Sequence, residues 1–85
     1  MIKPNHPEIG RELLAHEIHE GQIVAMQKEG RNAIATLWVT HISENSIHFH
    51  AGKLGITFLA CRLPDGHITD DDNVPMAMYA YLGQP

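Results

Sequence analysis

The stretch that decides the fold is WVTHISENSIHFHAGKLGITF, residues 38–58. Successive side chains of a β-strand point to opposite faces, so the pairing across each turn sets which residues share a face. If Ile42 faces Ile47 across the SENS loop, and Gly52-Lys53 forms the next two-residue turn, Phe49 faces Ile56. One face then collects the apolar residues Trp38, Ile42, Ile47, Phe49, Ile56 and Phe58. A slip by one residue would move this set to the other face, so the pattern favours this register.

The same register gathers three histidines on the opposite face. His41 faces His48, Val39 faces His50, and Thr57 lies beside them. Opposed Cβ atoms lie about 4.5–5.5 Å apart and diagonal ones about 7–8 Å apart, close enough for imidazoles to share one ion. Three histidines and a water are a known zinc arrangement. A zinc or copper site at these histidines is therefore an alternative to the simpler interpretation, in which they line the solvated side of a half-buried strand.

The remainder of the chain predicts further strands and one helix. Segments 22–27, 33–42 and 54–63 are rich in β-branched and apolar residues, and turn signals follow them, such as KEGR after the first and PDG after the last. Segment 74–82 has both strand and helix features, and its alternating tyrosines favour the strand. Pro7, Glu8 and a later Gly21 favour a helix over 7–16.

The pattern as a whole predicts an all-β fold with one short N-terminal helix. We expect a single domain over 1–85, with the helix at 7–16 and a β-barrel or meander at 22–82. The barrel would be small and antiparallel, with five to six strands, and SH3-like in shape.

Composition excludes several function classes. The 85 residues carry a formal charge of −4, and the six Lys and Arg residues are scattered singly, which argues against nucleic-acid binding. No apolar run approaches the roughly 20 residues of a membrane-spanning helix, so we expect no membrane partner. The single cysteine, Cys61, cannot form an intrachain disulfide. We therefore expect a reducing, cytoplasmic location.

No motif points to catalysis. HEIHE (16–20) spaces His16 and His19 three apart, whereas the metalloprotease signature needs four. TDDDN (69–73) lacks the ligand pattern of a calcium loop and is typical of an acidic turn. Cys61 and His67 would form a nucleophilic pair only with a third group to orient the base. We expect a protein that is not an enzyme and has no cofactor.

THISENSIHF (40–49) resembles the strand-turn-strand region of PilZ domains, which bind cyclic di-GMP. That family carries Asp/Asn-x-Ser-x-x-Gly there, and the matching positions are His41, Ser43 and Ser46. The acid or amide and the glycine are missing, as is the upstream Arg-rich stretch. The resemblance therefore does not extend the ligand to this chain.

The remaining positive signal is a second apolar face. Strands 33–42 and 54–63 carry apolar residues on both sides, and the predicted helix would cover only part of the outer one. We expect a non-catalytic binding or assembly module, with an interaction surface at Leu37, Val39, Leu59 and Leu63 for a protein partner or for self-association. A third alternative is a pH-responsive interaction, in which clustered imidazoles repel one another once protonated.

Overall fold

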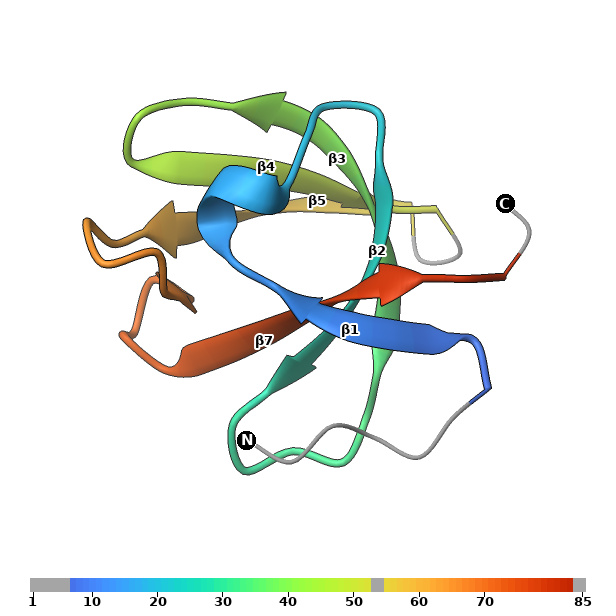
Figure 1. Cartoon of the computed structure of the whole chain (residues 1–85). Helices are drawn as coiled ribbons and strands as arrows, with labels where there is room; N and C mark the ends of the chain where they lie inside the picture. The colour runs from blue at the N-terminus through green and yellow to red at the C-terminus, as the bar shows by residue number, and fades with distance from the viewer. Residues whose placement is uncertain (1–6, 53–54, 84–85) are drawn as a thin grey trace.

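The computed structural model describes residues 7–52 and 55–83 and shows an antiparallel all-β fold (Figure 1). The elements, in chain order, are β1 (Ile9–Leu13), the 3₁₀ turn η1 (Ala15–Glu17), β2 (Ile23–Lys28), β3 (Ala35–Ile42), β4 (Ser46–Ala51), β5 (Ile56–Arg62), β6 (Ile68–Thr69) and β7 (Pro75–Tyr81). Segment 74–82, which had both strand and helix features, therefore contains a strand. No helix in the described ranges is long and apolar enough to cross a membrane.

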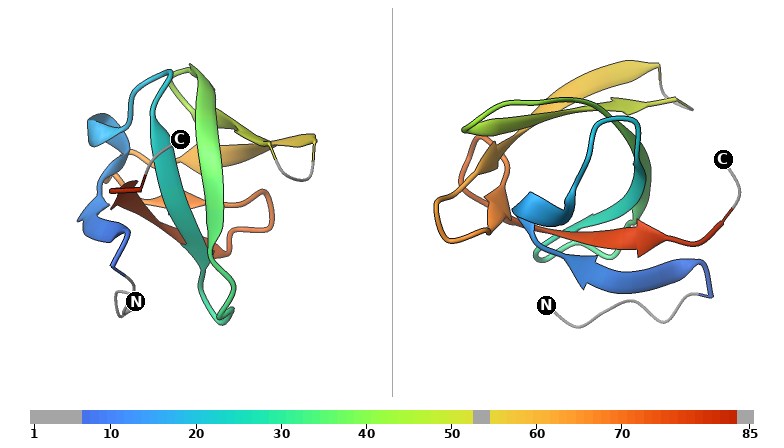
Figure 2. Two further views of the ribbon diagram at one scale, coloured as in Figure 1. Left: turned by 90° about the vertical axis from the view of Figure 1, so that its right-hand side faces the viewer. Right: turned by 45° about the horizontal axis from the view of Figure 1, so that its top comes forward.

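Six of the strands close into a barrel. The pairing order is β1-β7-β2-β3-β4-β5-β6, and β6 also pairs with β7, which completes the ring from β2 to β7. β1 lies outside the ring and pairs antiparallel with the C-terminal half of β7 (Figure 2). Closure leaves the ring without free edges, so its outward sheet faces are the larger surfaces available for contacts.

The barrel interior is filled by inward-facing apolar side chains. Phe49, Leu37, Ile47, Met78, Val24 and Val39 are all fully buried. Phe49 packs against Phe58 with ring centroids 5.5 Å apart. This interior carries most of the favourable free energy of folding, because burying a large aliphatic or aromatic side chain contributes about 1.5–3 kcal/mol.

The predicted N-terminal helix is wrong. Residues 9–13 form β1 on the edge of β7, followed only by a 3₁₀ turn. Ile9 and Leu13 are four residues apart and would share a face of a helix or of a regular strand, but the pairing with β7 shifts between Ile9 and Glu12. The shift sends Ile9 to a cluster outside the barrel and Leu13 to the interior. Gly10 permits the close approach, since a Cβ there would lie 3.1 Å from the Ala80 Cβ.

An ion pair fixes the segment that follows β1. Arg11 Nη2 lies 2.7 Å from Glu17 Oε2, and Glu17 Oε1 accepts a hydrogen bond from the Leu14 amide at 2.9 Å. The Arg11 hydrogen bond, helped by that amide, lowers the pKa of Glu17 from 4.5 to about 2. The charged carboxylate therefore holds η1 against the end of β1.

A second apolar cluster lies outside the barrel, on the outward side of β7. Its buried members are Ile9, Ala25, Ala77 and Tyr79. The Tyr79 side chain is fully buried, and its hydroxyl has no hydrogen-bond partner among the described residues. Burial raises the pKa of this phenol, with a smaller contribution from Glu12. β7 is thus covered on both faces, unlike β3, β4 and β5.

Candidate functional site

The candidate site is the outward face of β3, β4 and β5, and a β-bulge in β3 determines its composition. Next to the SENS loop the predicted register is confirmed, with Ile42 opposite Ile47 and His41 opposite His48. The pairing then shifts, and Val39 rather than Thr40 lies opposite Phe49. The extra residue reverses the faces of β3 beyond this point.

The bulge corrects three predictions. Leu37 and Val39, expected on an interaction surface, are 1% and 0% exposed and belong to the core. Trp38, expected in the core, points outward and is 54% exposed. His50 therefore lies opposite Trp38 instead of Val39.

The next hairpin has the predicted faces but another register. Phe49 pairs with Phe58, and Ala51 pairs with Ile56, two residues from the expected pairing. A shift of two preserves the face of every side chain, so Phe58 still packs against the core. Ile56 lies at the first position of β5 and is 50% exposed, contrary to its predicted place in the core. The predicted turn at Gly52-Lys53 falls partly outside the described residues.

The outward face carries no formally charged side chain. Its residues, from the alternation and burial along the three strands, are Thr36, Trp38, Thr40, His41, Ser46, His48, His50, Thr57, Leu59 and Cys61. The chain as a whole has ten acidic and six basic residues. None of these charged residues occupies an outward position of β3, β4 or β5.

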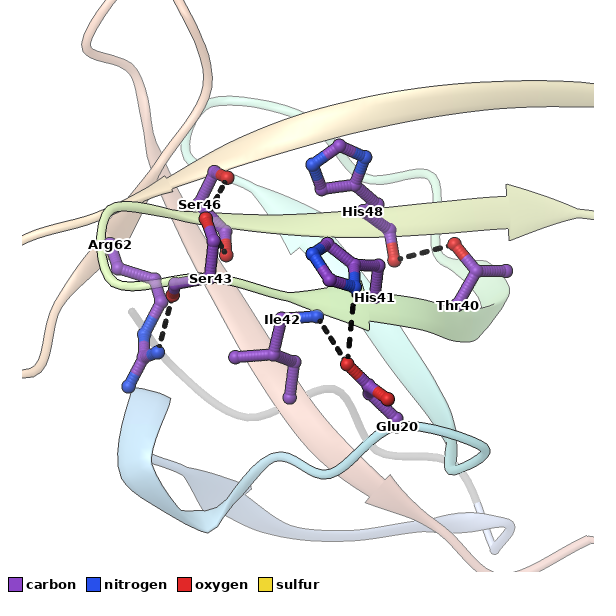
Figure 3. A network of polar contacts seen from close by, with 8 residues as sticks. All are labelled: Glu20, Thr40, His41, Ile42, Ser43, Ser46, His48 and Arg62. Atoms are coloured by element: carbon purple, nitrogen blue, oxygen red, sulfur yellow. Dashed lines mark hydrogen bonds and ion pairs between the residues drawn. The ribbon is translucent and has the colours of Figure 1, made fainter.

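Two of the three histidines on this face, His41 and His48, form a close pair. The rings of His41 and His48 have centroids 5.2 Å apart in an edge-to-face arrangement. His41 Nδ1 lies 3.3 Å from Glu20 Oε2, an oxygen that also accepts a hydrogen bond from the Ile42 amide (Figure 3). His50 lies in a different row of the sheet, opposite Trp38 and Thr57.

The described structure does not gather the three imidazoles at one point, as the predicted zinc or copper site would require. Among the described residues, potential ligand atoms of three or more side chains lie within 4.8 Å of one another only at Asp70, Asp71 and Asp72. His41, His48 and His50 do not meet this condition, and His50 lies two residues along β4 from His48, opposite Trp38 and Thr57.

The acidic run TDDDN forms the turn expected from its composition. Asp70 Oδ1 accepts hydrogen bonds from the amides of Asp72 and Val74, each at 2.9 Å, and Oδ2 lies 3.0 Å from Lys28 Nζ. These partners lower the pKa of the Asp70 carboxyl, with the Val74 amide contributing most. The Asp70 carboxylate therefore stabilises the turn between β6 and β7 and links this turn to β2 through Lys28.

Two apolar residues remain exposed on the face. Leu59, part of the predicted interaction surface, is 45% exposed and pairs with His48 across β4 and β5. Trp38 was missed as a surface residue, because β3 is apolar on both sides and alternation alone does not locate its bulge. Leu63, also part of the predicted surface, is 37% exposed but lies beyond the end of β5. Cys61 is a free, partly exposed thiol on the same face.

Comparisons with known proteins identify no relative. No protein-family model, no curated protein and no solved structure matches this chain. The fold and the outward face of β3–β5 define it as a small closed β-barrel with one uncharged, partly apolar sheet face.

Proposed function

We propose that this protein is a non-catalytic binding or assembly module that docks a protein partner on the outward face of β3–β5. The observation that carries the proposal is Trp38 on β3, 54% exposed on a face without formal charge. The SH3-like shape remains a prediction, and small barrels host many unrelated functions. The proposal therefore rests on the face itself.

The composition of the face supports docking over simple solvation. Interface centres are depleted in charged residues and enriched in aromatic ones, and Trp is among the commonest residues to dominate binding energy. A large aromatic side chain buries roughly 150–250 Å². Burying the exposed half of Trp38, about 100 Å², would contribute about 2.5 kcal/mol at about 25 cal/mol per Å². The hydroxyl and imidazole groups around it would supply hydrogen bonds with little desolvation cost compared with charges.

The proposal is tested by capture of partner proteins on immobilised protein, with a matched pair of surface variants. Trp38→Ser removes the exposed indole, whereas Leu82→Ser removes a 64% exposed leucine beyond the end of β7. We expect partners to be retained by the wild type and by Leu82→Ser but lost from Trp38→Ser. Circular dichroism should show that both variants are folded. Partners that bind Trp38→Ser as well as wild type would contradict the proposal.

A further inference from the structure

We propose that the occupant of this face is a second copy of the chain, and that protonation of the face releases it. This inference rests on the proposed function and specifies both its partner and its regulation. The outward face of β3, β4 and β5 is the surface that would pack against the same face of a second copy. It has no formal charge that packing would bury, and its histidines gain charge in mild acid.

The charge distribution favours a second copy over a charged partner. Each chain has a formal charge of −4, but none of it lies on the outward positions of β3–β5. Two copies can therefore pack these faces together without burying an unpaired charge, which is among the costliest errors at an interface. A charged partner surface would have no opposite formal charge to meet at neutral pH.

The strand order makes the face self-complementary. β4 lies between β3 and β5, and Trp38 pairs across it, through His50, with Thr57. A two-fold axis along β4 would place Trp38 of each copy over β5 of the other, where Thr57 and Leu59 lie. Each indole would then cover the exposed leucine region of the opposite sheet.

The same axis brings the imidazoles of the two copies together. His48 and His50 point outward from β4, the strand nearest the axis, so each would lie close to the equivalent residues of the second copy. His41 adds a third imidazole beside His48. Histidine changes charge between pH 5 and 8, so mild acid would add up to three positive charges to each face.

The other titratable groups offset only part of this charge. Glu20, from the loop before β2, faces His41 at 3.3 Å and would compensate that one imidazolium. Cys61 on β5 is the remaining titratable side chain on the described outward face, and it is never cationic. His48 and His50 would therefore meet like charges, which weakens association.

Sedimentation velocity of the purified chain over a series of concentrations tests the inference. At pH 7.5 we expect a monomer–dimer equilibrium, and at pH 5.5 a dissociation constant at least tenfold higher. Trp38→Ser should raise the constant at least tenfold at pH 7.5, while Leu82→Ser should leave it unchanged. Circular dichroism at both pH values should confirm that each protein remains folded.

A triple variant separates charge from packing. Replacing His41, His48 and His50 with Gln keeps polar side chains of similar size but removes the titration, so the dimer should persist and lose its dependence on pH. A chain that stays monomeric at pH 7.5, or a dimer that Trp38→Ser does not weaken, would overturn the second copy as occupant. A dimer equally stable at pH 5.5 would overturn the release by protonation.

These failures are distinguishable from failure of the proposed function. A monomeric chain whose captured partners still depend on Trp38 retains the docking face and excludes only self-association. If captured partners bind Trp38→Ser as well as they bind the wild type, the outward face of β3–β5 is excluded as the docking surface.

Discussion

Replacing Tyr79 with Phe should make the protein more stable. The Tyr79 side chain is fully buried between β1, β7 and β2, and its hydroxyl has no hydrogen-bond partner among the described residues. An unsatisfied buried polar group costs about 1–3 kcal/mol. The void left by one oxygen is no larger than a water-sized probe, about 10–15 Å³. At about 24 cal/mol per Å³ it would cost less than about 0.4 kcal/mol. The net expected gain is about 0.6–3 kcal/mol.

Urea titration and thermal unfolding of the two proteins measure this gain. For a domain of this size, 1 kcal/mol corresponds to roughly 4–8 °C in the midpoint of unfolding. Tyr81→Phe is the matched control, because the Tyr81 hydroxyl donates a hydrogen bond to Glu8 Oε2 at 2.9 Å and its loss should give no stabilisation. A Tyr79→Phe protein less stable than wild type by 1 kcal/mol or more would show that the hydroxyl is hydrogen-bonded, and the reasoning would fail.

Three further substitutions test the fold. Gly10→Ala places a Cβ 3.1 Å from that of Ala80 and should lower the free energy of unfolding by about 1–3 kcal/mol through overpacking. Gly52→Ala, whose Cβ would have nothing within 4 Å, should lower it far less. Equal effects of the two variants in urea titrations would contradict this packing. Asp70→Ala should lower the thermal midpoint more than Asp70→Asn, because asparagine keeps an oxygen that can accept hydrogen bonds from the two backbone amides. The reverse order would contradict the hydrogen bonding proposed for this turn. Because the pKa of Glu17 is lowered to about 2, its stabilisation is complete above about pH 4.5 and is lost as the pH falls through 2. Glu17→Gln should therefore lose less stability than wild type in acid titrations followed by circular dichroism, and identical acid profiles would argue against this ion pair.

Alternation of apolar and polar residues was sufficient to predict the hairpin at the SENS loop. Ile42 and Ile47 are opposed as expected, because a register slip there would have exposed the apolar face of β4. The same rule gave the correct face for Phe58 although the register differed by two, since side chains repeat with period two. Face assignment is therefore more robust to errors in turn length than the pairing itself.

Two irregularities could not be predicted from sequence, and both are β-bulges or register shifts. In β3, Leu37, Trp38 and Val39 are all apolar, so alternation does not tell which of them faces the core. Tertiary packing decides it, because Leu37 and Val39 are fully enclosed by the barrel. In β1, the shift between Ile9 and Glu12 sends Ile9 and Leu13 to opposite sides, although residues four apart share a face both on a helix and on a regular strand.

The most direct test of the account is the exposure of Trp38 in the folded monomer. It is the chain's single tryptophan, so intrinsic fluorescence reports on this side chain alone. In dilute solution we predict red-shifted emission, as for an indole in contact with water, and efficient acrylamide quenching. Blue-shifted emission with strong protection from acrylamide, in a sample shown to be monomeric, would place the indole in the core and contradict the bulge, the outward face and the proposals built on it.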